Sequence, residues 1–273
     1  MKHAMEVNLI MAPLNTRLKT AQRIAADASP VAMALFRKPL SITAKSDDSP
    51  VTIADQNTEK AIRAALEISF PGETIFGEEF GQSGNHSDMW IVDPIDGTRS
   101  FISGLPLFGM LLGFVADGAP QVGVINMPAL NELYAGARGM GATLNGTPIT
   151  TSSCRELSKA RLFLNEADKM AINDPVQFAR LITAGALRRF GADCYSHALV
   201  ASGNADAVID FGLQPYDYLP VAAVIEAAGG LMTDWQGQPL SLTSDGRTLT
   251  AATPALHAEL LDLVRQLQTQ PQN

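Results

Sequence analysis

The stretch WIVDPIDGTRSF, residues 90–101, places two carboxylates, Asp93 and Asp96, three positions apart directly after a short apolar run that is typical of a β-strand. Such a pair of acids is suited to holding a divalent metal ion. Gly97 allows the backbone to come close to a ligand, and Thr98 offers a hydroxyl group. The next residues are expected to form a short helix whose free N–H groups face an anion. The stretch therefore predicts a place where metal and phosphate meet.

Hydrolysis of a phosphate monoester requires more than two acids. The phosphoryl oxygens must be neutralised, hydroxide must form near neutral pH and the departing alkoxide must be stabilised, and two or more Mg²⁺ ions can do all three. Mg²⁺ prefers hard oxygen ligands, so further carboxylates are expected elsewhere in the chain. They occur as Glu78 and Glu79 after a glycine, as Asp55 at the end of a short strand-like segment, and as Asp217 before an apolar helix.

These motifs, in this order, resemble the signatures of the inositol-monophosphatase-like family of Mg²⁺-dependent phosphatases. The family pattern is GEE, DPIDGT, and WD before a helix that ends in GG, and the counterparts here stand at residues 77–79, 93–98, 216–217 and 229–230. Tyr216 occupies the place where many members carry Trp. The resemblance covers nearly the whole chain, because Lys45 and the segment PVTIAD after it also match. It implies an α/β (α+β) fold, a layered αβαβα sandwich of the inositol monophosphatase and fructose-1,6-bisphosphatase type.

The resemblance also implies a set of metal ligands. Glu78, Asp93 and the backbone carbonyl of Ile95 would hold one metal ion. Asp96 and Asp217 would hold a second ion together with Asp93, which bridges the two. The expected cofactor is Mg²⁺, with two or three ions per site.

Further roles follow from the same resemblance. Thr98, polarised by Asp55 or working with Glu78, would help to activate the attacking water. The amide groups of Gly97 and Thr98 would bind the phosphate, and Lys45 is a further candidate for phosphate binding. Water is expected to attack directly, without a phosphoenzyme.

The metal ligands determine the reaction, so the identity of the substrate's alcohol part must be predicted from other residues. The segment at residues 191–217 carries Asp193 where inositol phosphatases have small neutral residues. It also carries Asp210, at a position where family members use an acid to contact the organic part of the substrate. Two anions beside a phosphate site repel each other unless a cation joins them. Histidinol phosphate, with its amine and imidazole, would supply that cation, and the segment resembles the histidinol-phosphate phosphatases of this superfamily, which act in histidine biosynthesis.

Other interpretations stay open from sequence alone. Asp193 could instead form a salt bridge with Arg188 or Arg189. The same metal site would serve an inositol 1-phosphate or nucleotide 3′-phosphate phosphatase. A non-catalytic metal-binding scaffold or dimeric interaction protein is a third hypothesis, and the intact Thr98 argues against it, because a silent protein has no need for a water-activating hydroxyl.

Three more polar residues are ambiguous. Glu79 is expected to be a solvated or supporting acid rather than a metal ligand. His197 is expected to be packed or on the surface, since hard Mg²⁺ disfavours imidazole. Arg99 could steer the phosphate or only face water.

Composition limits the class of protein. The chain has 273 residues, 46% of them hydrophobic, and a net charge of −8, which argues against a general nucleic-acid binder. The two cysteines, Cys154 and Cys194, fit neither a zinc motif nor a disulfide framework. No apolar run is long enough to span a membrane. These features predict a cytoplasmic enzyme. The resemblance implies a small phosphorylated amino alcohol as its substrate, and the family's tendency to dimerise predicts a homodimer.

The pattern of apolar residues predicts the order of elements. Helices are expected at residues 16–37, with a break at Pro30, and at 57–69, 175–186, 195–202 and 219–228. Hairpins in a largely antiparallel sheet are expected between residues 75 and 149. Residues 1–152 would form an N-terminal half carrying most metal ligands, and residues 153–273 a C-terminal half completing the site, within one structural unit.

Overall fold

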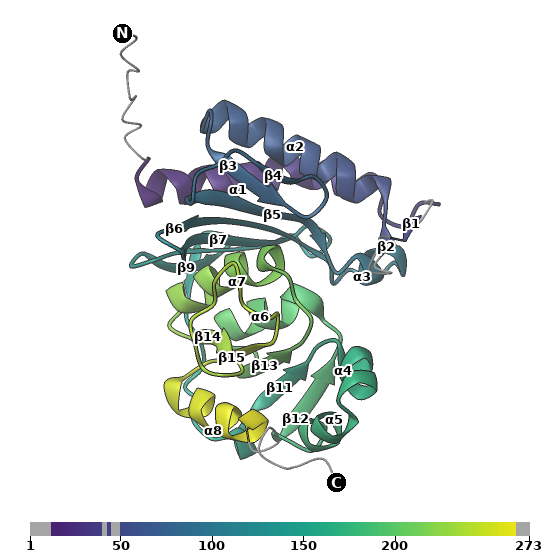
Figure 1. Ribbon diagram of the computed structural model, residues 1–273, viewed down its shortest axis with the longest axis vertical. Coiled ribbons are helices and arrows are strands. Elements are labelled where there is room, and N and C mark those ends of the chain that lie inside the picture. The colour runs from purple at the N-terminus through teal and green to yellow at the C-terminus, as the bar shows by residue number, and fades with distance from the viewer. Residues whose placement is uncertain (1–11, 40–42, 45–49, 266–273) are drawn as a thin grey trace.

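The computed structural model describes residues 12–39, 43–44 and 50–265, so the predicted phosphate contact Lys45 lies outside the described residues. The chain forms five layers in the order helix, sheet, helix, sheet, helix, which confirms the predicted αβαβα sandwich (Figure 1). Helices α1 (Leu14–Met33) and α2 (Ile53–Ser69) cover the outer face of the first sheet. Helices α6 (Asp193–Ala201) and α7 (Pro215–Ala227) lie between the two sheets.

The first sheet has eight strands in the order β10-β9-β8-β7-β6-β5-β3-β4 and is antiparallel except for the parallel pair β3 and β5. Its central hairpin turns at Asp117 and Gly118, both with positive φ, as the sequence predicts. The strands are β3 (Thr74–Gly77), β4 (Gly81–Ser83), β5 (Met89–Asp96), β6 (Gly109–Ala116), β7 (Ala119–Met127), β8 (Glu132–Ala137), β9 (Gly141–Leu144) and β10 (Thr147–Ile149).

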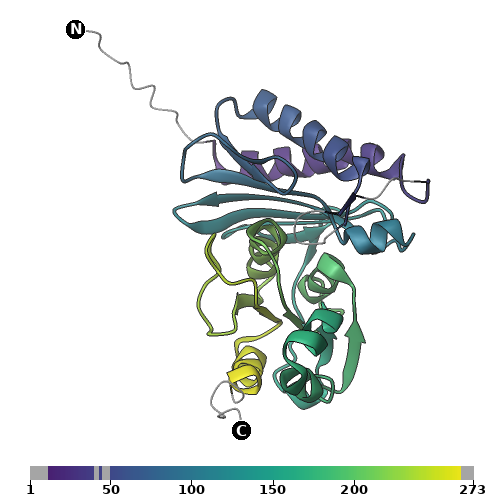
Figure 2. The ribbon, with the colours of Figure 1, turned by 45° about the vertical axis from the view of Figure 1, so that its right-hand side comes forward.

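The second sheet is mixed and has five strands in the order β12-β11-β13-β15-β14. Strand β11 is parallel to both of its neighbours, whereas β15 is antiparallel to both of its own. The strands are β11 (Arg161–Leu164), β12 (Leu187–Phe190), β13 (Ala207–Asp210), β14 (Leu231–Asp234) and β15 (Thr248–Ala251). Helices α4 (Ala167–Asn173), α5 (Pro175–Leu181) and α8 (Pro254–Arg265) form the last layer, which Figure 2 shows at the end of the molecule opposite α1 and α2.

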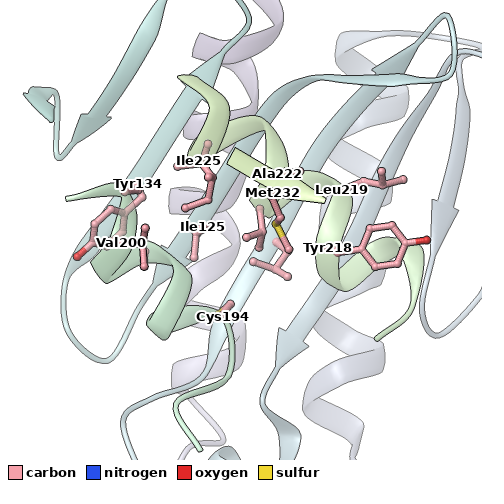
Figure 3. Close-up of a cluster of buried hydrophobic side chains, with 14 of the residues drawn as sticks. Ile125, Tyr134, Cys194, Val200, Tyr218, Leu219, Ala222, Ile225 and Met232 are labelled. Atoms are coloured by element: carbon pink, nitrogen blue, oxygen red, sulfur yellow. The ribbon is translucent and has the colours of Figure 1, made fainter. Parts of the chain in front are cut away.

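The core between the first sheet and the middle helices is apolar. Figure 3 shows side chains of α7, among them Leu219, Ala222 and Ile225, packed together with Ile125 of β7 and Tyr134 of β8. Each large apolar side chain that leaves water here contributes about 1.5–3 kcal/mol to folding. This packing fixes α7 against the sheet whose strands carry the acidic motif.

Three glycines allow α7 to lie very close to the first sheet. Gly113 of β6, Gly123 of β7 and Gly136 of β8 are cross-strand partners in one row. A Cβ atom at Gly123 would lie 2.0 Å from the carbonyl oxygen of Pro220 in α7. Any side chain at this position would push the helix away. The row of glycines therefore places the first turn of α7, with Asp217, beside the end of β5.

Two helix predictions were wrong in instructive ways. Pro30 does not break the first helix, which runs through it to Met33, and Pro30 lies in its last turn. The second helix begins at Ile53 and not at residue 57, so Asp55 lies inside its first turn and does not end a strand. Thr52 caps this helix, and Asp55 accepts a hydrogen bond from the Thr52 amide at 2.8 Å, completing a capping box.

Smaller outcomes concern the C-terminal half and the cysteines. Helix α5 ends at Leu181 and not at residue 186, and β12 follows after a turn in which Gly185 has a positive φ. Cys154 and Cys194 are both free. Among the helices of the described ranges, none combines the length and the apolar character that crossing a bilayer requires.

Candidate active site

A bulge in β5 brings the two aspartates of the DPIDGT motif together. Asp93 pairs with Leu111 of β6 and Asp96 pairs with Gly109, so three steps along β5 match two along β6. The amide of Ile95 inside the bulge donates a 2.9 Å hydrogen bond to Asp93. Because an extra residue re-aims the side chains that follow it, Asp96 turns to the same side as Asp93 rather than to the opposite face.

The first turn of α7 supplies a third carboxylate. Oxygen atoms of Asp93, Asp96 and Asp217 all lie within 4.8 Å of one another. Asp217 is held by a 2.7 Å hydrogen bond from the amide of Gln214, and Asp96 by one of equal length from the amide of Cys194. The structure thus gathers three of the predicted metal ligands from two distant segments.

The electrostatics of this cluster fit a hard cation. Burial raises the pKa of Asp93 well above its usual range, and the charges of Glu78 and Asp217 raise it further. Burial and the charge of Asp193 likewise raise the pKa of Asp96, and burial raises the pKa of Asp217 to about 7. Among the described residues no basic side chain forms an ion pair with these three aspartates. A divalent ion with oxygen ligands would relieve this repulsion.

Glu78 joins the cluster from the turn after β3. Its backbone amide donates to Val92 of β5 at 3.1 Å, and its side chain borders the same pocket as Asp93. The turn is held from below by the fully buried Glu59 of α2, which accepts a 2.7 Å hydrogen bond from the amide of Glu79. Glu59 is in turn paired with Arg63 at 2.7 Å.

Thr98 lies between the acidic cluster and α2. Its hydroxyl is 3.1 Å from the carbonyl oxygen of Ile95 and 3.3 Å from a carboxylate oxygen of Asp55. Asp55 is fully buried, and its other oxygen is engaged by Thr52. Gly97 precedes the short helix α3 (Thr98–Ile102) with a φ of 80°. The contact between Thr98 and Asp55 that the family pattern implies is therefore present in the geometry.

The acidic cluster opens into a pocket whose other wall comes from the C-terminal half. Asp193, at the start of α6, and Asp210, at the end of β13, both line this wall. Burial raises the pKa of Asp193 to about 6, a hydrogen bond from Ser100 opposes that shift, and the charge of Asp210 adds to it. Residues lining the pocket are Glu78, Asp93, Ile95, Asp96, Gly97, Thr98, Arg99, Asn165, Glu166, Lys169, Asp193, Cys194, His197, Asp210, Gly212, Leu213 and Asp217.

Polar residues that line the pocket but were not predicted as part of the site are Asn165, Glu166, Lys169 and His197. Asn165 follows β11, is 3% exposed and donates to Asp210 at 2.8 Å. His197 is packed, as expected, but its Nε2 lies 3.3 Å from Asp210 and its Nδ1 lies 2.9 Å from the hydroxyl of Thr250. A polar residue directly after the apolar run RLFL was the available signal for Asn165, since strand ends commonly carry functional side chains.

The basic residues considered from sequence have specific places. Arg99 borders the pocket with a half-exposed side chain and forms ion pairs with Asp168 at 3.2 Å and Glu166 at 3.6 Å. Arg188 donates to backbone carbonyls of the turn before β12 and not to Asp193. Within the described chain, the salt bridge proposed as an alternative role for Asp193 is not formed, and its carboxylate is bonded to Ser100 instead.

Comparison with known proteins agrees with this site and fold. The family model described as inositol monophosphatase family matches residues 14–269, and the chain belongs to this family of phosphatases. A protein named histidinol-phosphatase from Chlorobaculum parvum is 42% identical over 250 residues, covering 89% of this chain and 95% of the relative. The Nus factor SuhB of Pasteurella multocida is 32% identical over 92% of this chain and 97% of its own. A solved inositol monophosphatase from Zymomonas mobilis is 35% identical with a TM-score of 0.84, covering 93% of this chain and all of the other.

Proposed function

We propose that this phosphatase hydrolyses L-histidinol phosphate to L-histidinol and phosphate, a step of histidine biosynthesis, with Mg²⁺ as cofactor. The observation that carries the proposal is the presence of two acids, the partly buried Asp193 and the buried Asp210, in the pocket wall next to the acidic cluster. A substrate with a cationic alcohol part and an anionic phosphate would match both sides of this pocket. The 42% identity to a protein named histidinol-phosphatase supports the same choice.

In this proposal the phosphate end of the substrate lies over the acidic cluster. Asp93, Asp96, Asp217, Glu78 and the carbonyl of Ile95 would hold two or three Mg²⁺ ions. When bound, these ions neutralise phosphoryl oxygens and lower the pKa of bound water. The carboxylates supply the negative charge that keeps the ions in place, and hard oxygen donors are the type that Mg²⁺ selects.

The chain's own groups orient the reactants. The hydroxyl of Thr98, backed by Asp55, and the carboxylate of Glu78 are assigned to the attacking water. The amides of Gly97 and Thr98 are assigned to the phosphate, with Lys45 as a further contact. Water attacks the phosphorus directly, so no covalent phosphoenzyme forms.

The organic end would lie against the opposite wall. There Asp193 and Asp210 would face the protonated amine and the imidazole. A cation close to a buried acid lowers that acid's pKa, so substrate binding would keep Asp193 ionised. A neutral alcohol such as inositol could donate hydrogen bonds to these acids but would leave their repulsion unrelieved.

The deciding experiment compares kcat/KM for histidinol phosphate, inositol 1-phosphate and a nucleotide 3′-phosphate in the presence of Mg²⁺. We expect a preference of roughly a hundredfold or more for histidinol phosphate, about 2.7 kcal/mol in transition-state binding. The variant Asp193→Asn should raise KM for histidinol phosphate far more than for a neutral monoester. No preference, or a preference for inositol 1-phosphate, would keep the reaction and discard this substrate.

We further propose that the enzyme acts in the cytoplasm as a homodimer. Strand β12 is an edge of the second sheet and leaves Leu187 and Phe190 about half exposed, at 50% and 49%. Edge strands with exposed apolar side chains are surfaces that a second chain can cover. Light scattering on the purified protein would test this, and a monomer mass at micromolar concentration would reject the dimer.

A further inference from the structure

The side-chain amide of Asn165 connects the two chain segments that carry the acids of the pocket wall. Its nitrogen lies 2.8 Å from the carboxylate of Asp210 and 3.1 Å from the backbone carbonyl of Asp193. Its oxygen accepts a 3.3 Å hydrogen bond from the amide of Ala192. A single nearly buried group, reached from the end of β11, thus contacts both the start of α6 and the end of β13.

The surrounding hydrogen bonds make this group specific. Ser196, one turn into α6, accepts from Asn165 at 2.9 Å and donates to the carbonyl of Asp193 at 2.8 Å. Asp210 has further donors, the His197 ring at 3.3 Å and the amide of Phe211 at 2.8 Å. Buried polar networks in which every member has a partner hold their side chains in one orientation. The carboxylate of Asp210 is therefore fixed from three sides.

The backbone of Asp193 needs this support. It has a φ of 46°, in the left-handed region that non-glycine residues rarely adopt. Such a conformation persists only where surrounding contacts determine it. Asn165 hydrogen-bonds to the backbone on both sides of the bond that φ describes. It accepts from the amide of Ala192, before this bond, and donates to the carbonyl of Asp193, after it.

We propose that Asn165 is a positioning residue that determines specificity, because it sets the distance and orientation between Asp193 and Asp210 for the cationic part of the substrate. The inference rests on the proposed function and deepens it. Asn165 does not itself act on the phosphate. A neutral donor is required here, since a third carboxylate at this position would repel Asp210, and an alanine would leave Asp210 and the Asp193 carbonyl short of a partner.

The test measures the ratio of kcat/KM for histidinol phosphate to kcat/KM for inositol 1-phosphate in the full-length Mg²⁺-loaded protein. Asn165→Ala should lower this ratio at least tenfold, mainly through KM for histidinol phosphate, while hydrolysis of inositol 1-phosphate changes less than threefold. Asn165→Asp, which keeps the shape of the side chain, should lower the ratio in the same direction. Asn204→Ala, at an exposed side-chain amide that donates to Ser202 after the same helix, is the matched control and should leave the ratio unchanged.

The outcomes separate the two levels of the proposal. Retained hydrolysis of inositol 1-phosphate shows that a variant is folded and metal-competent, and Asn165→Asp replaces Asn165→Ala if the latter does not fold. Equal losses on both substrates, or an unchanged ratio, would overturn the role of Asn165 while leaving the wild-type preference intact. If the wild type itself lacks the preference, the proposed function fails and the inference fails with it.

Discussion

The carboxylate of Asp193 accepts a 2.6 Å hydrogen bond from the hydroxyl of Ser100, which joins α6 to the short helix α3 of the DPIDGT motif. The same carboxylate occupies the space beside Gly97, where a Cβ atom would lie 2.7 Å from it. The position of the Asp193 carboxylate and the backbone at Gly97 are therefore linked. A substitution at Asp193 or at Gly97 is therefore expected to shift the other residue.

Gly97→Ala tests this link. The substitution forces alanine into a φ of 80° and against Asp193, so we expect a loss of about 1–3 kcal/mol in the free energy of unfolding and a strong loss of turnover. In an Asp193→Ala background the clash with the carboxylate disappears, and the backbone strain and a tight 3.1 Å contact with the Cβ atom at position 193 remain, so the same change should cost less. Urea denaturation of the four proteins measures the coupling. Strictly additive losses would show that the two residues do not constrain each other.

Asp93→Asn should abolish turnover without unfolding the protein. Asp93 is the acid assigned to both metal ions, so we expect kcat to fall by roughly a thousandfold or more, about 4 kcal/mol. The metal-free variant should be at least as stable as the wild type, because burial and neighbouring charges already disfavour ionised Asp93. Phosphate release and thermal unfolding in EDTA measure the two effects. Asp88→Asn, just before the other end of β5, is the control, and appreciable activity in Asp93→Asn would reject the two-metal assignment.

The acidic cluster could be predicted in part from local sequence, because DPIDGT contains two of its carboxylates, a glycine turn and a helix start within a few residues. The layered fold followed from the family pattern and is confirmed. The helix expected from residue 57 begins at Ile53, because Thr52 and Asp55 form the capping box. A capping acid and a strand-end acid look alike in sequence, and only the contacts decide between them.

The pocket wall could be predicted only in part. Asp193 was singled out because its charge is unusual in that segment, and Asp210 because family members use an acid at that position. What holds the two acids depends on tertiary contacts between β11, α6 and β13. Asn165 is 28 and 45 positions away from the acids that it contacts. No local sequence pattern predicts a contact between residues so far apart in the chain. The row of glycines under α7 was missed for the same reason, since its members meet only when three strands are in register.

Gly123→Ala should separate α7 from the first sheet near the acidic cluster. Its Cβ would meet the carbonyl of Pro220, three positions after Asp217, whereas a Cβ at Gly136 would meet Ala227 at the far end of the helix, 2.7 Å away. We expect both alanine variants to lose stability, by about 1–3 kcal/mol for overpacking. Only Gly123→Ala should also raise the Mg²⁺ concentration that gives half-maximal activity. An equal change in both variants would mean that the glycines serve packing alone.

Stability of the metal-free protein should fall as pH rises, and Mg²⁺ should oppose the fall. Burial raises the pKa of Asp217 from 3.8 to about 7 and raises those of Asp93 and Asp96 well above their usual range. Between pH 3.8 and about 7 the folded chain binds more protons than the unfolded chain, because Asp217 keeps its proton only in the folded state. The stability that these groups contribute is therefore complete below pH 3.8 and is lost as pH rises through 7. A cation bound to the ionised carboxylates offsets that loss.

Thermal unfolding between about pH 5 and 8, with EDTA or with Mg²⁺, measures this linkage. We expect the midpoint with EDTA to fall with pH and the gap between the two curves to widen. Asp217→Asn, which removes one titrating group, should flatten the EDTA curve and reduce the gap, because both effects depend on ionised Asp217. Parallel curves, or a midpoint in EDTA that rises with pH, would show that these aspartates do not titrate as a repelling cluster, and the case for a metal site at this position would lose its electrostatic basis.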